Sequence, residues 1–230
     1  MSEKIDNRKI YLSGGGDENQ SSFFDKFFFE LLKQDGKLLY IPIALKDNKI
    51  YSRVNLWMEK VIKIHKREDL QIETWKRIPE LINLNLYDGI YIGGGNTWTL
   101  MDDITKSGFK DYLIQYVENG GLLYGGSAGA IILGKRIDTQ NDENKINLLQ
   151  DDGLNLVNEY SIACHFKNDE RAKFNEWAQN KKSPIICLPE GSGAILESGN
   201  IRCIGVNGCI IYMPEGNEIA INQADFFSVE

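Results

Sequence analysis

The sequence contains few of the side chains that bind metals or form disulfides. Its 230 residues include only two histidines and four cysteines, and no two cysteines have the C-x-x-C spacing. With so few imidazoles, a nitrogen-rich metal site is not expected. The cysteines fall within or beside apolar segments, so we expect buried thiols rather than disulfides or zinc ligands. They are Cys164, Cys187, Cys203 and Cys209.

Long apolar segments and an excess of positive charge are also missing. The sequence has no apolar run of about 18 residues and no basic start followed by an apolar stretch. Its net charge is −7 and its sequence pI is near 5.0, whereas nucleic-acid binding normally needs a clustered basic surface. We therefore expect a soluble, cytoplasmic protein that binds neither nucleic acids nor membranes.

Short apolar segments alternate with helical segments up to about residue 135. No linker or low-complexity stretch interrupts them, so residues 1–230 are expected to form a single domain. The alternation predicts an α/β fold with a mostly parallel sheet covered on both faces. Strands are expected at 9–12, 37–44, 70–75, 87–92 and directly before Ser127, and helices at 23–32, 52–67 and twice between 97 and 118.

Glycines stand at the carboxyl ends of several of these expected strands. Active sites of parallel sheets gather at that edge, so residues 14–16, residues 93–97 and Ser127 are expected to lie together.

The pattern changes after residue 135. Strands are expected at 161–166 and 184–188, with a helix at 169–180 between them. Four short strands follow at 194–196, 201–206, 209–213 and 218–221. Ser198-Gly199-Asn200 and Asn207-Gly208 are typical of hairpin turns, so the chain is expected to finish as a C-terminal antiparallel meander.

Ser127 lies in the pattern Gly125-x-Ser127-x-Gly129, between an apolar segment and a run of small and aliphatic residues. In this pattern the serine occupies a sharp strand-to-helix turn, and its hydroxyl is held beside the unpaired N–H groups of the helix. These groups can stabilise an oxyanion. Ser127 is therefore the candidate nucleophile, although a plain helix N-cap explains a serine there equally well.

A nucleophilic serine needs a base, and histidine is the usual one. His65 lies on the apolar stripe of a charged helix, where a structural role is expected. His165 follows an expected strand and is the candidate base. A carboxylate should orient it, and both Glu190, after the strand at 184–188, and Asp142 are candidates.

Four segments together resemble the serine peptidase family of aspartyl dipeptidase (peptidase E) and cyanophycinase. They are Gly93-Gly94-Gly95-Asn96-Thr97, Gly126-Ser127-Ala128-Gly129-Ala130, His165-Phe166 and Pro189-Glu190-Gly191. The resemblance implies a flavodoxin-like three-layer sandwich, similar to class I glutamine amidotransferases but with serine in place of cysteine.

The resemblance also assigns roles to individual residues. Ser127 would be the nucleophile and His165 the base, and the oxyanion hole would comprise Gly94, Gly95, Asn96 and Ala128. For the third member, Glu190 matches the glutamate of a Ser-His-Glu triad and is favoured. Residues 139–142 look like the segment that carries an aspartate proposed for the dipeptidases, which leaves Asp142 as the alternative.

The dipeptidases that the chain resembles cleave after an N-terminal aspartate in small peptides and need no cofactor. A cation should face that carboxylate, preferably a bidentate arginine. Arg171 lies where family members also have arginine, and Arg136 is a weaker candidate. The chain departs from the dipeptidases at Cys164, where they have proline, which leaves the substrate open.

Two other functions remain open at this stage. An α/β-hydrolase-type esterase would use Ser127, Asp142 and His165 in the chain order of that fold, and a catalytically silent member of the same fold would bind a small ligand. The wide apolar face at 23–32 further suggests a homodimer.

Overall fold

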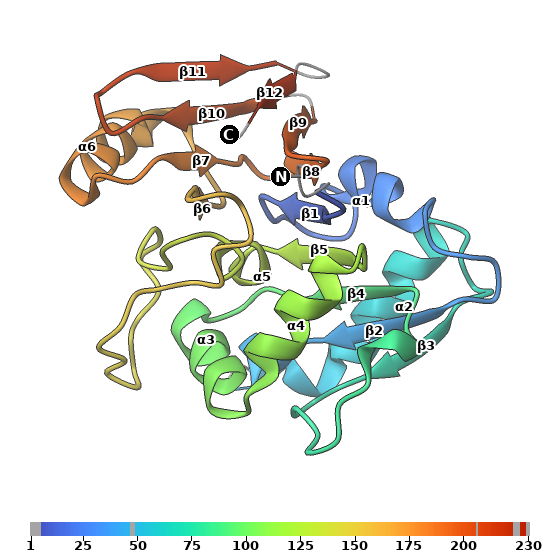
Figure 1. Cartoon of the computed structure of the whole chain (residues 1–230). Coiled ribbons are helices and arrows are strands. Elements are labelled where there is room, and N and C mark those ends of the chain that lie inside the picture. Colours follow the sequence, from blue (N-terminus) through green and yellow to red (C-terminus); the bar gives the residue numbers. More distant parts are fainter. Residues whose placement is uncertain (1–5, 47–48, 206, 223–225, 229–230) are drawn as a thin grey trace, which may run out of the picture.

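The computed structural model describes residues 6–46, 49–205, 207–222 and 226–228. A central sheet of eight strands, ordered β12-β9-β8-β1-β5-β4-β2-β3, forms its core (Figure 1). These strands are β1 (Lys9–Ser13), β2 (Lys37–Ile41), β3 (Gln71–Thr74), β4 (Gly89–Ile92), β5 (Leu122–Gly126), β8 (Gly193–Glu197), β9 (Asn200–Ile204) and β12 (Phe226–Ser228). Strands β1 to β5 pair in parallel, whereas β8, β9 and β12 add antiparallel strands beside β1.

Helices cover both faces of this sheet. They are α1 (Ser22–Phe29), α2 (Val54–Ile64), α3 (Thr97–Lys106), α4 (Phe109–Glu118) and the short α5 (Ala128–Ile131). Side chains alternate between the faces, because successive residues of a strand point in opposite directions. Tyr124 packs among residues of α1 and α2, whereas Leu123 packs among residues of α3 and α4. The predicted parallel sheet, covered on both faces, is confirmed.

A second, smaller sheet lies against one end of the first, at the top of Figure 1. Its order is β11 (Glu218–Ile221), β10 (Cys209–Tyr212), β7 (Ile185–Cys187) and β6 (Ser161–Ala163), and α6 (Arg171–Lys181) packs on it. The predicted C-terminal antiparallel strands are therefore present, but they are divided between the two sheets.

Of the two predicted hairpin turns, one is confirmed and one is wrong. Ser198 and Gly199 both have positive φ, at 50° and 74°, and join β8 to β9 with Glu197 opposite Asn200. Asn207-Gly208 does not close a hairpin, because β9 pairs with β8 and β12 while β10 pairs with β7 and β11. That connection crosses from one sheet to the other.

The cysteine prediction holds for two of the four residues. Cys164 and Cys187 are free and buried. Cys203 and Cys209 form a disulfide, so the expectation of four thiols is wrong. The short crossover from β9 to β10 brings their Cα atoms within 6.0 Å, a separation that a disulfide can bridge.

Helix α1 buries most of its aromatic face within the fold. Phe24, Phe28 and Phe29 are fully buried, while Phe23 and, just beyond the helix, Leu31 remain about half exposed. A homodimer through this face stays a prediction. Within the described ranges, no helix is both long and apolar enough to span a membrane.

Candidate active site

Ser127 occupies a strained turn between β5 and α5. Its backbone has φ 51° and ψ −115°, which is unusual for a residue with a side chain. The turn needs glycine on both sides, because a Cβ on Gly129 would collide with the carbonyl oxygen of Ile92 in β4, and one on Gly125 with the carbonyl oxygen of Gly129. The backbone N–H of Ser127 donates to the carbonyl of Ser13 at the end of β1 (3.1 Å). The predicted elbow is therefore present at the carboxyl edge of the sheet.

His165 reaches Ser127 from the loop that follows β6. Its N–H donates to the carbonyl of Gly14 (2.8 Å), which fixes this loop to the loop after β1. Its backbone is left-handed, with φ 54°. The Nε2 atom lies 2.8 Å from Oγ of Ser127, within hydrogen-bond distance.

Glu190 approaches the other nitrogen of the same ring, from the loop after β7. Its Oε1 lies 2.8 Å from Nδ1 of His165. The neighbouring Gly191 N–H donates to the carbonyl of Gly15 (3.0 Å), so the glutamate loop is also tied to the loop after β1. When the carboxylate accepts a hydrogen bond from Nδ1–H, Nε2 is left unprotonated and able to accept the serine proton.

Asp142 lies elsewhere, at the start of α3. Its Oδ2 accepts hydrogen bonds from the N–H (2.8 Å) and the hydroxyl (2.6 Å) of Thr97. Its carbonyl accepts from Trp98 Nε1 (3.1 Å). Of the two candidate carboxylates, the structure therefore brings Glu190, and not Asp142, to His165.

The loop after β4 brings backbone groups beside the serine hydroxyl. A Cβ placed on Gly94 would stand 3.6 Å from Oγ of Ser127, so the backbone of this loop directly flanks the hydroxyl. Ala128 is the first residue of α5, and the first N–H groups of a helix have no partner within it. The backbone of Gly94 and the first residue of α5, Ala128, thus lie beside Ser127.

Asn96, also in the loop after β4, forms hydrogen bonds with other parts of the chain. Its N–H donates to the carbonyl of Ala44 (2.9 Å) and its side-chain amide donates to the carbonyl of Glu143 (2.9 Å). Its Oδ1 accepts from the N–H of Thr99 and caps α3. The donors that the structure pairs on Asn96 are thus engaged by the carbonyls of Ala44 and Glu143, and its place in the oxyanion hole stays a prediction.

Arg171, the predicted substrate cation, lies at the start of α6. It forms an ion pair with Glu218 (2.7 Å), and both side chains are partly exposed. A cavity of about 490 Å³ includes Arg171 together with Phe166 and Pro189, the neighbours of His165 and Glu190. Arg171 is thus on the His165 side of the site.

The weaker alternative, Arg136, forms ion pairs with Asp138 and Asp151. These contacts hold the segment that carries it, and none of them reaches the serine. In the structure, Arg136 therefore links its own segment to the segment that contains Asp151.

The second histidine has a structural position, as expected. The His65 ring stacks on Phe29 with 4.7 Å between ring centroids, and burial lowers its pKa. Cys164 is buried beneath the site, and its Sγ lies 3.5 Å from the carbonyls of Ser13 and Ser127. Burial raises the pKa of this thiol, which makes it a poor nucleophile.

A second cavity at the site was not predicted. It has a volume of about 580 Å³ and lies between α2, the end of β2 and the glycines after β4. The residues that line it are Gly16, Tyr40, Leu45, Ile50, Arg53, Val54, Leu56, Trp57, Lys60, Gly93 and Gly94. The helical pattern at 52–67 was recognised in the sequence, but nothing in it shows which side chains stay uncovered. We call this cavity the Trp57 pocket.

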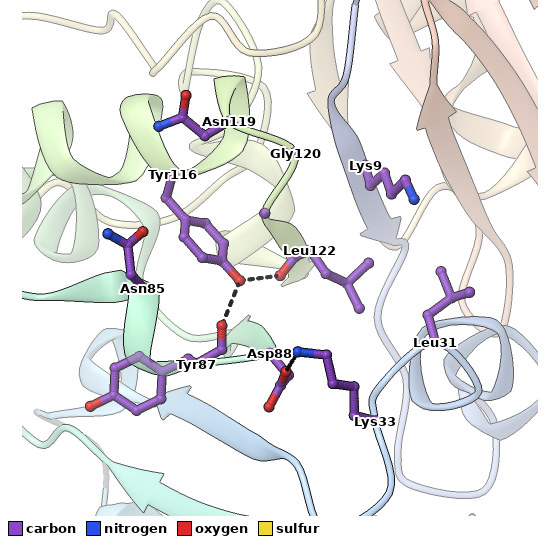
Figure 2. A pocket seen from close by; sticks show the side chains of 11 residues that line it. Lys9, Leu31, Lys33, Asn85, Tyr87, Asp88, Tyr116, Asn119, Gly120 and Leu122 are labelled. Carbon is purple, nitrogen blue, oxygen red and sulfur yellow. Dashed lines mark hydrogen bonds and ion pairs between the residues drawn. The ribbon is translucent and has the colours of Figure 1, made fainter.

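Another cavity, of about 370 Å³, lies at the opposite edge of the sheet (Figure 2). There the Tyr116 hydroxyl donates to the carbonyls of Tyr87 and Leu122, and Lys33 pairs with Asp88. Tyr87 and Asp88 precede β4 and Leu122 begins β5, whereas Ser127 follows the end of β5, so the cavity is remote from the serine. In the part of the chain that the structure describes, no group of three or more His, Cys, Asp or Glu side chains could hold a metal ion.

The hydrogen-bonded series from Ser127 through His165 to Glu190 has the arrangement of a serine-hydrolase triad. The sequence model of peptidase family S51 matches residues 10–204. The chain therefore belongs to peptidase family S51.

Individual relatives agree with this membership. Over 144 residues the chain is 28% identical to a Peptidase E of a Shewanella species, a match that covers 58% of this chain and 61% of that protein. It thus spans about three fifths of that relative's length. An uncharacterized peptidase of Listeria monocytogenes is 33% identical over 145 residues, which cover 61% of this chain and 67% of that protein.

A solved structure supports the fold. The crystal structure of a peptidase from an acI-B1 Actinobacterium superposes with a TM-score of 0.70 at 17% identity, over 96% of each chain.

Proposed function

We propose that this chain is a serine peptidase that hydrolyses small peptides through an acyl-enzyme on Ser127. One observation carries the proposal. The His165 ring lies between two partners, with Nε2 2.8 Å from Oγ of Ser127 and Nδ1 2.8 Å from Oε1 of Glu190. This is the geometry in which a histidine can take a proton from serine while a carboxylate stabilises the imidazolium that forms.

In the first half of the cycle, Oγ attacks the peptide carbonyl and its proton passes to Nε2 of His165. The proton then passes to the departing amine, the C–N bond breaks and an ester remains on Ser127. In the second half, water gives a proton to His165 and attacks the ester, which releases the acid and restores the serine.

Backbone donors would stabilise the negative oxygen that forms in each half of the cycle. The N–H groups of Gly94, Gly95 and Ala128 are the candidates that we propose, because the Gly94 backbone flanks the hydroxyl and Ala128 directly follows Ser127 at the start of α5. Fixed donors need no reorganisation when charge develops, which is why such groups accelerate acyl transfer.

The substrate class that we propose is a small peptide with an N-terminal aspartate, as for an aspartyl dipeptidase. Relatives named Peptidase E support this choice, and Arg171 is the cation that would face the aspartate. Since Arg171 is paired with Glu218, the substrate carboxylate would share or replace that partner.

Hydrolysis of dipeptides that begin with Asp, Glu, Asn or Ala tests this proposal. We expect the wild type to cleave the Asp series, Ser127→Ala and His165→Ala to lose this activity, and Arg171→Gln to lose the preference for Asp over Asn. If esters are turned over far better than every peptide, the esterase alternative replaces the proposal. If nothing is cleaved and Ser127→Ala still binds the ligand, the silent-binder alternative does.

A further inference from the structure

The Trp57 pocket borders the candidate active site. Gly94, one of its lining residues, flanks Oγ of Ser127. Gly16, another, follows Gly15, whose Cα lies against the His165 ring. A substrate whose scissile carbonyl lies at Ser127 can therefore extend toward this pocket, which shares no described lining residue with the cavity that contains Arg171.

The wall of the pocket is aromatic and aliphatic. Trp57 stacks on Tyr40 with 6.0 Å between ring centroids and contacts Tyr91 edge-on at 5.9 Å, which fixes its ring. Leu56 is 56% exposed beside it. Uncovered apolar side chains around a preformed cavity favour an apolar ligand group. When such a group binds, its own apolar surface and that of the pocket are both removed from water.

The charged residues that line the pocket in the described part of the chain are both basic. They are Arg53 and Lys60, and no described carboxylate lines it. Lys60 is paired with Glu18 (3.0 Å), whereas Arg53 has no ion-pair partner among the described residues. In a chain of net charge −7, an arginine beside an apolar cavity that pairs with no described carboxylate favours a ligand that carries its own carboxylate.

From this combination we propose that the Trp57 pocket binds the C-terminal residue of a dipeptide. Its large apolar side chain would pack on Trp57 and Leu56, and its free carboxylate would pair with Arg53. The inference rests on the proposed function and extends it. In this arrangement the N-terminal aspartate lies toward Arg171 and the scissile carbonyl lies at Ser127. The fit of the second residue in the Trp57 pocket then determines which dipeptides are cleaved.

Two measurements test the pocket. The first is kcat/KM of the wild type for Asp-Phe, Asp-Leu, Asp-Gly and the amide of Asp-Phe. We expect Asp-Phe and Asp-Leu to exceed Asp-Gly by roughly 10- to 100-fold, since filling an apolar pocket has effects of this order. Leu56→Ala and Trp57→Ala should reduce this ratio, because each lowers kcat/KM for Asp-Phe and Asp-Leu more than for Asp-Gly.

Arg53→Gln should lower kcat/KM for Asp-Phe by roughly 10-fold, as expected for a charge-assisted contact, and lower it clearly less for the amide, which has no carboxylate to lose. Arg77→Gln is the matched control, because Arg77 is exposed and lies outside the pocket. Equal rates on Asp-Gly and Asp-Phe in the wild type, or equal losses on all substrates in the variants, would overturn the proposal.

The second measurement is calorimetric binding of the same peptides to Ser127→Ala, which needs no turnover. Tighter binding of Asp-Phe than of Asp-Gly, lost on adding Leu56→Ala, supports the pocket even if the wild type hydrolyses none of them. In that case the proposed function is overturned, but the proposal for the Trp57 pocket stands. Turnover of Asp-Xaa peptides without any dependence on Xaa leaves the proposed function intact and overturns only this inference.

Discussion

Oε1 of Glu190 lies 2.8 Å from Nδ1 of His165, and the competing carboxylate, Asp142, is bonded to Thr97 instead. Glu190→Gln should therefore lower kcat by about 10²- to 10⁴-fold, because an amide can favour the wrong tautomer of the ring and cannot stabilise imidazolium. Steady-state kinetics on an Asp-Xaa dipeptide, with the melting temperature as a check on folding, measure this effect.

Asp142→Asn is the matched variant for that prediction. It removes a charge that accepts two hydrogen bonds at the start of α3, so we expect a loss of stability of about 1 kcal/mol and a much smaller loss of kcat. A collapse of kcat in Asp142→Asn, with Glu190→Gln nearly normal, would assign the third member of the triad to Asp142.

The loop after β1 holds the His165 ring in place, which gives a second prediction. A Cβ on Gly15 would overlap the ring, at 2.9 Å from Nε2, and Gly15 has φ +94°. Gly15→Ala should therefore displace the base and lower kcat by at least about 10-fold. Gly108→Ala is the control, since Gly108 also has positive φ (+70°) but no atom within 4 Å of the added Cβ. Equal kcat in the two variants would contradict this role of Gly15.

A buried carboxyl beneath the sheet predicts a specific pH dependence of stability. Asp25 is fully buried and accepts hydrogen bonds from Tyr124 and Ser21. Burial raises its pKa from 3.8 to about 6. Because the native state then binds the proton more tightly than the unfolded state, the contribution of Asp25 to stability is greatest below pH 4 and falls as the pH rises to 6.

The loss expected from this shift is about 3 kcal/mol. Asparagine carries no charge, so Asp25→Asn should be relatively more stable at pH 7 than at pH 4 when compared with the wild type. Urea unfolding of both proteins at the two pH values measures the difference. A difference in stability that does not change with pH would show that Asp25 does not titrate in this range.

The elbow and its partners were predictable because they depend on local chemistry. Ser127 needs glycines at fixed spacing, and strands of a parallel sheet end at one edge, so the meeting of the β1, β4 and β5 loops followed from sequence order. The helix at 169–180 was also placed correctly, although its first turn is a 3₁₀ helix and α6 begins at Arg171.

Contacts between distant segments could not be predicted in the same way. Asn207-Gly208 indicates a turn but not which strands the turn joins. The pairing of Cys203 with Cys209 depends on a crossover between sheets, and the partner of Arg171 is 47 residues away. The Trp57 pocket depends on which part of an amphipathic helix remains uncovered, which periodicity alone does not reveal.

The most direct test of the account is to locate the covalent intermediate. Wild-type protein is treated with an acylating or phosphonylating serine probe, and the modified residue is identified by mass spectrometry. We predict a single adduct on Ser127, which Ser127→Ala abolishes and His165→Ala strongly slows. Full hydrolysis of an Asp-Xaa dipeptide by Ser127→Ala, or an adduct on another residue that accompanies inactivation, would contradict the account.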